Sequence, residues 1–245
     1  MQVRTYRKIH RYLGIVIGVQ LLLWTGSGLL FSLNPIDKVR GETEQAEPLM
    51  LSMNQPVASP EPAINMLRAN DPTIGIRSVA LRPHLDGAVY EIEFRLGDST
   101  QWALADAATG RLRPPVDRDE AVEIARRDFA PATGVKSVEL VTGVDEDSEY
   151  RGRPLPAYQV VFDHPIGTRV YVSVERGAVT ARRNDRWRLF DFLWMLHIMD
   201  YQARDNFNTV WLQVVSALGL LTVMSGFVLA GATSPRIRRW LAGRA

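Results

Sequence analysis

Two long stretches without a charged residue constrain how this chain of 245 residues can fold. The first is Tyr12–Leu33, with 22 residues, and the second is Asn206–Ser234, with 29. A helix needs about 20 predominantly apolar residues to cross a bilayer, so both stretches are long enough. We therefore predict one transmembrane helix close to each end of the chain. The 172 residues between them are enough for a water-soluble region with its own hydrophobic core.

The charges are distributed unevenly along the chain. All 27 acidic residues lie between positions 34 and 205, where they outnumber the 21 basic residues. The basic residues that flank the two stretches are Arg4, Arg7, Lys8, Arg11, Arg236, Arg238, Arg239 and Arg244. Because basic flanks stay on the cytoplasmic side, we predict an inner-membrane protein with both termini in the cytoplasm and the central region in the periplasm. The pI of 9.0 could also suggest nucleic acid. Each basic cluster, however, lies beside a predicted span, where attraction to anionic lipid explains it, so we expect the lipid bilayer and no nucleic acid as a partner.

The central region contains two similar arrays of predicted elements, at 60–116 and 117–183. In each array a short segment with helical periodicity precedes three segments with the alternating pattern of strands. Tyr90 aligns with Tyr158 and Gly110 with Gly177, at offsets of 68 and 67, which indicates an internal duplication. Alternation also predicts that matching side chains of the two arrays form the cores. These pairs are Val79 and Val138, Leu81 and Leu140, Tyr90 and Tyr158, Ile92 and Val160, and Phe94 and Phe162.

Several motifs resemble those of the PepSY family. In the first array, Tyr90-Glu91-Ile92 and Asp106-Ala107-Ala108-Thr109-Gly110 look like the strand and turn motifs of a PepSY domain. The second array keeps Tyr158-Gln159-Val160 but has Glu175-Arg176-Gly177 in the turn, so it is the degenerate copy. The segment Arg7–Gly14 and the pair Leu196-His197 are similar to motifs of PepSY-associated transmembrane proteins.

The resemblance implies an α+β fold in which two transmembrane helices flank a periplasmic tandem of PepSY-like helix-plus-antiparallel-sheet units. With it, each segment of the chain has a predicted role. We predict a cytoplasmic basic end and first transmembrane helix at 1–34, a linker at 35–59, PepSY-like units at 60–116 and 117–183, an interfacial helix at 184–205, the second transmembrane helix at 206–234, and a cytoplasmic basic tail at 235–245.

Two of the four histidines stand at the edges of the predicted spans and are candidate haem ligands. His10 has Gly14 and Gly18 at i+4 and i+8, so one helix face leaves room for a porphyrin. His197 has Asp200 at i+3, whose carboxylate can hold one ring nitrogen and leave the other for a metal. A span of 22 residues rises about 33 Å, so His10 and His197 cannot share one iron, and each needs a second ligand from another chain or a non-histidine ligand. The alternative is that the glycines form a helix-packing surface and the histidines meet lipid phosphate or cap a helix.

Other residues have a simpler interpretation. His84 and His164 adjoin prolines in predicted turns, where we expect them to be exposed. A basic run beside Trp187 is predicted to touch lipid headgroups; it consists of Arg182, Arg183, Arg186 and Arg188. The sequence has no nucleophile triad, phosphate loop or dinucleotide fingerprint, so we predict no catalytic residue and leave enzymatic activity open.

Three functions are compatible with these observations. The first is a binding or accessory subunit of a membrane complex, in which the periplasmic strands dock a protein or peptide. The spans of such a subunit assemble with other membrane helices or with a second copy. The second, implied by the resemblance, is a haem-b electron-transfer subunit related to ferric-siderophore reductases. The third is a protease-regulating module, because PepSY units also occur in peptidase propeptides.

Overall fold

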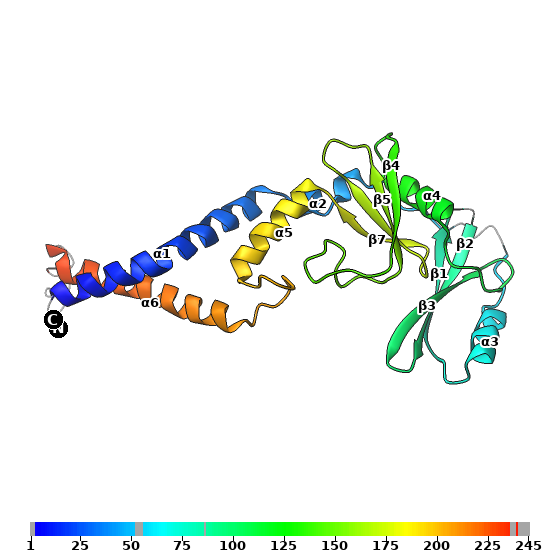
Figure 1. Cartoon of the computed structure of the whole chain (residues 1–245), viewed down its shortest axis with the longest axis horizontal. Helices are drawn as coiled ribbons and strands as arrows, with labels where there is room; N and C mark the ends of the chain where they lie inside the picture. Colours follow the sequence, from blue (N-terminus) through cyan, green and yellow to red (C-terminus); the bar gives the residue numbers. More distant parts are fainter. Residues whose placement is uncertain (1–2, 52–55, 86, 236–238, 240–245) are drawn as a thin grey trace. The chain divides into compact units, whose positions relative to one another are not determined.

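The computed structural model describes residues 3–51, 56–85, 87–235 and 239 (Figure 1). The chain forms two compact units, one made of Met1–Pro35 with Leu189–Ala245 and the other of Ile36–Arg188. We call them the helical unit and the β unit. The fold is mixed α+β, with long apolar helices at both ends and antiparallel sheets in the middle, which confirms the coarse prediction. The basic tail predicted for 235–245 lies outside the described residues except at positions 235 and 239.

The helical unit is built on α1 (Val3–Leu33) and α6 (Val210–Thr233), both of which are long and apolar enough to cross a membrane. The helix α1 ends at Leu33 because the next residue precedes Pro35, where further helix is disfavoured. The two helices pack against each other at Gly219, where an ideal Cβ would lie 3.6 to 3.9 Å from side chains of α1. A glycine at this crossing therefore lets the two backbones approach closely.

The segment before α6 differs from the prediction. Instead of one helix over 184–205, the chain forms α5 (Asp185–Ile198) and then a loop. Met199 and Arg204 adopt left-handed backbone conformations there, with φ angles of 54° and 60°, and such residues interrupt a right-handed helix. The helix α6 is capped by Thr209, whose hydroxyl oxygen accepts a hydrogen bond from the N–H of Leu212 at 3.2 Å.

The β unit contains two antiparallel sheets, each accompanied by one helix. The first sheet has the order β1-β2-β3, and its elements are α3 (Glu61–Asn70), β1 (Gly75–His84), β2 (Gly87–Leu96) and β3 (Ser99–Asp106). The second has the order β4-β5-β6-β7, and its elements are α4 (Arg118–Asp128), β4 (Val135–Val141), β5 (Ala157–Phe162), β6 (Arg169–Ser173) and β7 (Ala178–Arg183). Two short elements precede them, α2 (Ile36–Val39) and the 3₁₀ helix η1 (Glu42–Glu44).

The two sheets share irregularities at matching positions. The register shifts in β1 between Ile76 and Ser78, and in β4 between Val135 and Ser137. After the third strand of each sheet the chain makes a turn that ends in a glycine with positive φ, 71° at Gly110 and 56° at Gly177. The chain after Gly177 then forms β7, whereas after Gly110 it makes a single bridge. Because of this extra strand, the second sheet has four strands, one more than the three predicted for each array.

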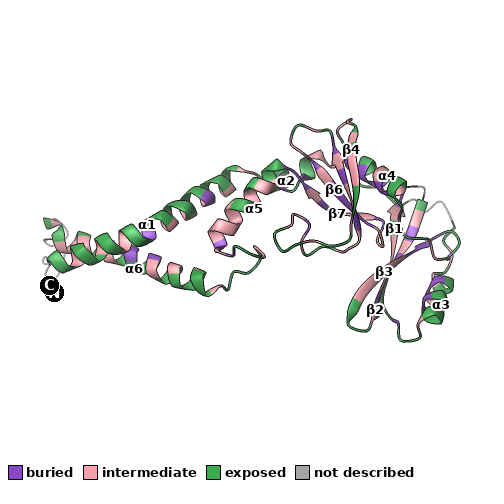
Figure 2. Cartoon of the chain, in the orientation of Figure 1, coloured by how far each residue is buried: buried purple, intermediate pink, exposed green. Residues whose placement is uncertain are grey.

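The core of the β unit extends over both sheets (Figure 2). Ile92 and Phe94 on one face of β2 pack with α3, whereas Val89 on the other face packs with α4 and the second sheet. The expectation of two cores is therefore only partly right. Val79 and Leu140 are 36% and 52% exposed, because they lie on the edge strands β1 and β4, beyond the helices that cover the central strands.

A buried ion pair also connects the two sheets. Glu91 on β2 has a side chain only 6% exposed, and Arg176 reaches it from the turn between β6 and β7. The Nε and Nη2 atoms of Arg176 donate to the two carboxylate oxygens at 3.0 and 3.1 Å. Arg82 on β1 adds a third contact at 3.1 Å, and the guanidinium of Arg176 lies 5.2 Å from the ring centre of Trp102. This geometry fixes the position of the second sheet on the first.

The two ends of the β unit lie side by side. The side-chain amide of Asn184, just after β7, donates to the carbonyl oxygen of Lys38 at 3.2 Å. An ideal Cβ on Gly41 would lie 3.5 Å from the Cβ of Arg182, so this contact continues along the strand. The chain therefore enters and leaves the β unit at the same place.

Candidate functional site

His10 lies in the interface between α1 and α6. Its Nδ1 is 2.8 Å from the hydroxyl oxygen of Ser225, and its ring rests against Gly226, where an ideal Cβ would be 3.2 Å from Cε1. The hydroxyl of Ser225 donates its own proton to the carbonyl of Thr222 at 2.7 Å. The serine oxygen therefore accepts the proton of Nδ1, which leaves the lone pair of His10 on Nε2.

His197 repeats this arrangement near the other end of α1. Its Nδ1 is 2.8 Å from the hydroxyl oxygen of Ser27, which in turn donates to the carbonyl of Trp24 at 3.2 Å. The indole N–H of Trp24 donates to the carbonyl of His197 at 2.7 Å. The rings of Trp24, Phe31 and Trp194 surround the imidazole at centroid distances of 5.7 to 6.2 Å. His197 is therefore held as the same tautomer as His10, with Nε2 as its acceptor.

Asp200 does not serve His197 in the predicted way. Its carboxylate accepts hydrogen bonds from the backbone N–H groups of Gln202, Asp205 and Asn206 at 3.0 to 3.3 Å. These bonds, that of Asn206 above all, lower the pKa of Asp200. The carboxylate thus organises the loop after α5, and the partner of His197 is Ser27 on α1.

The glycines predicted to line a porphyrin slot lie apart from these contacts. An ideal Cβ on Gly14 or Gly18 would meet no described atom within 4 Å, and the same holds for Gly26 and Gly28. His10 is turned toward α6 instead, where it fills the space above Gly226. The structure therefore does not bring His10 and the open glycine surface of α1 together.

The donor set can be compared with the requirements of a haem. Ser27 follows His10 by 17 residues of one helix, which places the two histidine sites about 26 Å apart. Each of these two sites in the helical unit has one imidazole, because the other two histidines of the chain belong to the β unit. In each imidazole the Nδ1–H donates to a serine, which leaves Nε2 as the nitrogen with a lone pair. Histidines that bind a metal commonly have this arrangement, in which one ring nitrogen donates a hydrogen bond and the other binds the metal. The residues thus supply one histidine nitrogen at each of the two sites, and a haem there would need a second ligand from another chain or a non-histidine ligand.

Ser27 and Ser225, which orient the two rings, were missed at the sequence level. Both belong to runs of small residues that predict helix packing, and a serine in such a run gives no sign of which side chain it faces. Their role becomes visible only once the rotation of α1 against its neighbours is known.

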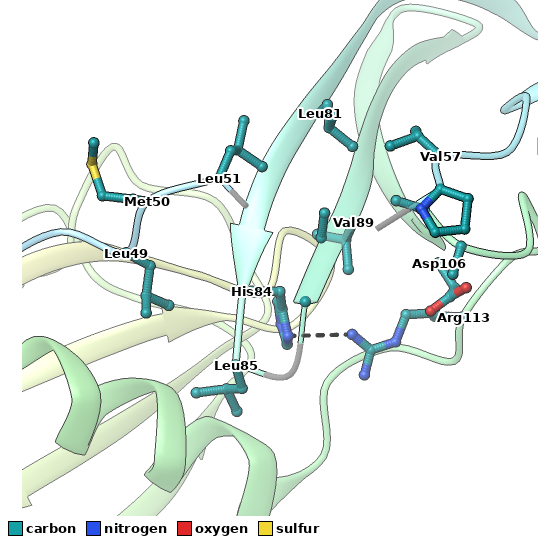
Figure 3. A pocket seen from close by; sticks show the side chains of 15 residues that line it. Leu49, Met50, Leu51, Val57, Leu81, His84, Leu85, Val89, Asp106 and Arg113 are labelled. Carbon is teal, nitrogen blue, oxygen red and sulfur yellow. Dashed lines mark hydrogen bonds between the residues drawn. The ribbon is translucent and has the colours of Figure 1, made fainter. Parts of the chain in front are cut away.

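A second candidate site is a cavity of about 530 Å³ in the β unit (Figure 3). Its apolar walls include Leu49, Leu51, Val57, Leu81, Leu85 and Val89. His84, Asp106 and Arg113 supply polar groups to the same cavity. A hollow that combines apolar walls with a few convergent polar groups is typical of a binding site for a small molecule or a side chain of a partner.

His84 is buried, which corrects the expectation that it is exposed, and it is part of the polar wall. A guanidinium nitrogen of Arg113 lies 3.4 Å from its Nδ1, and Arg113 also donates to Glu120 at 2.6 Å. Since arginine is only a donor, Nδ1 of His84 is the acceptor. The carboxylate of Asp106 accepts from the N–H and hydroxyl of Thr109, both at 2.8 Å, and these bonds lower its pKa.

Comparison of the chain with protein-family models, with curated proteins and with solved structures finds no match in any of the three.

Proposed function

We propose that this protein is a two-pass inner-membrane protein with cytoplasmic ends, in which a periplasmic pair of PepSY-like units serves as a binding or accessory subunit of a membrane complex. The matched register shifts and glycine turns of the two sheets support their relation to each other. The shared PepSY-like motifs support the family. The cavity beside β1 and β2 supports a binding role for the β unit.

The observation that carries the subunit role is the open glycine surface of α1. This surface consists of Gly14 and Gly18, which lie one turn apart on the same face of the helix, and an ideal Cβ on either of them meets no described atom within 4 Å. Glycines let transmembrane helices approach closely, and tight van der Waals packing is the main force that associates helices in lipid. Because α6 packs elsewhere on α1, this surface is available to a helix of another subunit or of a second copy.

Photo-crosslinking in cells tests this role. A benzophenone amino acid at Leu22, which is exposed and flanks Gly18 on the helix, should crosslink to a protein of the inner membrane. The double variant Gly14→Leu/Gly18→Leu should abolish the crosslink, because the added side chains separate the helices. Val19→Leu, which adds bulk on an exposed face, should leave the crosslink intact. A crosslink that survives the double glycine variant would refute the proposed surface.

A haem-b electron-transfer subunit is the second candidate, favoured by the hydrogen bonds of His10 and His197 to Ser225 and Ser27. When bound, haem supplies reversible one-electron transfer at each level of the membrane. The absorption spectrum of protein purified after expression with ample haem decides the matter. We expect a Soret band that is weakened in His197→Ala and unchanged in His164→Ala if this candidate is correct, and no Soret band if it is not. The protease-regulating alternative rests on the resemblance alone.

A further inference from the structure

We propose that α5 is a re-entrant helix, which enters the membrane beside α1 after its first turn, ends near the middle of the bilayer and presents its exposed face to lipid acyl chains. This inference rests on the proposed crossing of the membrane by α1. It goes beyond the subunit role, because it gives a membrane depth and a lipid contact to the segment that was predicted to lie in the interface.

The contacts of α5 fall on one stripe of α1. The ring centre of Phe31 lies 4.6 Å from that of Phe190, and the hydroxyl oxygen of Ser27 lies 2.8 Å from Nδ1 of His197. The order of these contacts makes the two helices antiparallel, so α5 extends from the end of α1 toward its middle. The stripe has the spacing i, i+4, i+7 and i+11 of one helix face, and it consists of Gln20, Trp24, Ser27 and Phe31.

The last carbonyl groups of α5 are bonded to side chains of this stripe. The last four carbonyls of a helix have no partner within it, so side chains or water must supply one. The side-chain amide of Gln20 donates to the carbonyl of Leu196 at 3.2 Å, and the indole N–H of Trp24 donates to the carbonyl of His197 at 2.7 Å. Because α5 ends at Ile198, both carbonyls belong to this last group. Bonding by an apolar helix is what a helix end requires in hydrocarbon, where water is absent.

The two donors lie near the middle of the uncharged stretch Tyr12–Leu33. Trp24 is 12 residues after Tyr12 and 9 before Leu33, so it lies about 18 Å from one end of the stretch and about 14 Å from the other. Gln20 is a polar side chain in the same stretch, and its bond to Leu196 accounts for it. When α1 crosses the membrane, the end of α5 therefore lies near the bilayer centre.

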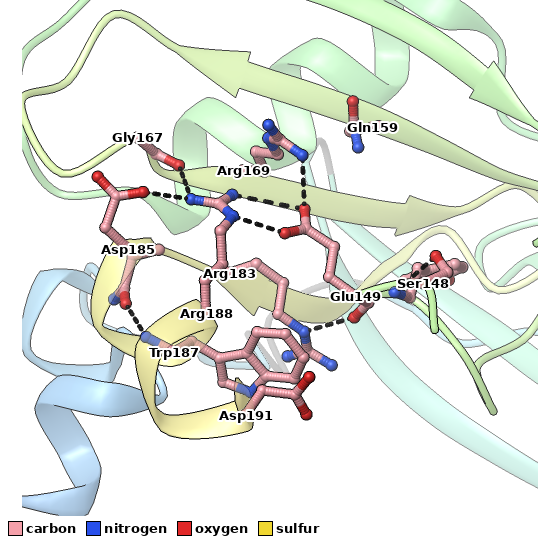
Figure 4. Close-up of polar contacts among 12 residues, drawn as sticks. Ser148, Glu149, Gln159, Gly167, Arg169, Arg183, Asp185, Trp187, Arg188 and Asp191 are labelled. Carbon is pink, nitrogen blue, oxygen red and sulfur yellow. Dashed lines mark hydrogen bonds and ion pairs between the residues drawn. The ribbon is translucent and has the colours of Figure 1, made fainter. Parts of the chain in front are cut away.

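The charged groups at the start of α5 are paired with other groups of the β unit. Arg188 donates to Glu149 at 2.8 Å and to Asp185 at 2.7 Å (Figure 4). Arg182, from the same basic run, forms an ion pair with Asp128. These two arginines are neutralised within the protein, so the predicted contact with lipid headgroups does not hold for them. Contact with the membrane is thus left to the part of α5 that follows.

That part, Leu189–Ile198, has no charged face. Its one charged residue is Asp191, whose side chain is 6% exposed and accepts a hydrogen bond from Arg204 at 2.6 Å. Leu189 and Phe192 are 54% and 50% exposed. A helix that lies flat in the interface has a strongly polar face opposite its apolar one, whereas a helix without such a face is surrounded by protein or by lipid. At the depth set by Gln20, the exposed face of α5 meets acyl chains.

The loop after α5 bonds its backbone groups internally. The carboxylate of Asp200 accepts hydrogen bonds from the N–H groups of Gln202, Asp205 and Asn206 at 3.0 to 3.3 Å. Irregular backbone is tolerated at membrane depth only where its polar groups are bonded within the protein or meet water. The loop therefore meets the condition for a chain that turns back inside the membrane.

Spin labels measure the depth of α5. The chain has no cysteine, so labels can be attached to single cysteines at Leu189, Phe192 and Leu196, which share one face of α5. The full chain is reconstituted in phosphatidylcholine bilayers. Collision of each label with oxygen, which concentrates in hydrocarbon, is compared with collision with a water-soluble nickel chelate. We expect the depth to increase by up to about 10 Å from Leu189 to Leu196, which are seven residues apart at 1.5 Å per residue.

Two further labels serve as references. Leu22→Cys lies at the exposed middle of α1 and reports hydrocarbon, and Asp98→Cys lies at an exposed turn of the β unit and reports water. Equal depths at the three positions of α5 would mean that the helix lies flat and would overturn the proposal. Low access of both reagents to Phe192 would also overturn it, because protein would then cover this face. Access of the nickel chelate to Leu22 would instead refute the proposed crossing of α1, so the two failures are distinguishable.

The donors on α1 provide an independent check. The double variant Gln20→Leu/Trp24→Phe keeps the shape of both side chains but removes both N–H groups. The label at Leu196 should then move toward the membrane surface, because the freed carbonyls have to reach water. The control Gln213→Leu removes the same amide from an exposed position of α6 and should leave the label at its original depth. An unchanged depth in the double variant would overturn the role of the two donors in holding α5 in the membrane.

Discussion

Replacing Glu91 by Gln should destabilise the β unit far more than the same change at Glu93. Glu91 has a side chain only 6% exposed and makes three contacts with Arg176 and Arg82. Removing one partner of a buried ion pair costs about 3–5 kcal/mol, and since Arg176 remains partly exposed we expect about 2–3 kcal/mol. Glu93 lies two residues further on the same strand, with a side chain 27% exposed, one ion pair to Arg77 at 3.4 Å and a hydrogen bond from the hydroxyl of Ser78 at 3.4 Å, which a glutamine can keep. Loss of such a surface pair costs about 0.5 kcal/mol or less.

Amide hydrogen exchange on the full chain in detergent measures the difference locally. Peptides from β2 and β3 report the free energy of opening of the first sheet, independently of the helical unit. A loss of about 2–3 kcal/mol corresponds to exchange that is about 30- to 140-fold faster, whereas Glu93→Gln should change it by no more than about twofold. Equal exchange in the two variants would refute the argument that the buried ion pair holds the two sheets together. A second check is Arg176→Gln in the Glu91→Gln background, which should add much less than it costs alone.

Three further predictions concern single positions. Gly177→Ala should lower the free energy of unfolding by about 2–4 kcal/mol, because the backbone is left-handed there and the new Cβ would lie 2.7 Å from a side-chain carbon of Leu104. Gly97→Ala, where the backbone is also left-handed but the space is open, should cost about 1 kcal/mol in the same measurement, and equal costs would contradict the packing of the turn. Burial opposes ionisation of Glu149, but hydrogen bonds from an arginine and a tyrosine outweigh it and lower its pKa, so its stabilising effect should be complete above pH 4.5 and lost as the pH falls below that value. Glu149→Gln should flatten this part of a plot of melting temperature against pH, and parallel plots for the two proteins would disprove the assignment. Since the chain has no cysteine, Asp98→Cys should react with an impermeant maleimide in intact spheroplasts and Thr5→Cys only after lysis; the opposite pattern would reverse the proposed topology.

Local sequence patterns predicted much of the fold. The two uncharged stretches predicted α1 and α6, since a run of that length and composition has few alternatives to a long helix. Alternation predicted β2 with its buried Ile92 and Phe94. The glycines at 110 and 177 were recognised as equivalent, and both adopt positive φ in the structure. Periodicity could not show that Val79 lies at an uncovered edge, because the extent of the covering helix is a tertiary property.

The candidate site was predictable only in its histidines. Asp200 was assigned to His197 on helical spacing, but the helix ends at Ile198, and an i+3 relation has no meaning once the chain leaves the helix. The true partners, Ser27 and Ser225, are about 170 and 215 residues away from their histidines, so no local pattern connects them. His84 was assigned to an exposed turn because it follows Pro83, yet Gly177 and Glu120, both distant in the sequence, lie against its ring.

The meeting of the two ends of the β unit has a consequence for the order of assembly. Pairing α1 with α6 closes a loop of 176 residues, from Asn34 to Thr209. Once the β unit has folded and Asn184 lies beside Lys38, only about 30 residues remain free between the two helices. With about 0.6 kcal/mol for each doubling of loop length, this shortening reduces the entropic cost of pairing by about 1.5 kcal/mol. A folded β unit thus holds the two ends of the loop together, which favours an order of assembly in which the β unit folds first and α1 and α6 then associate.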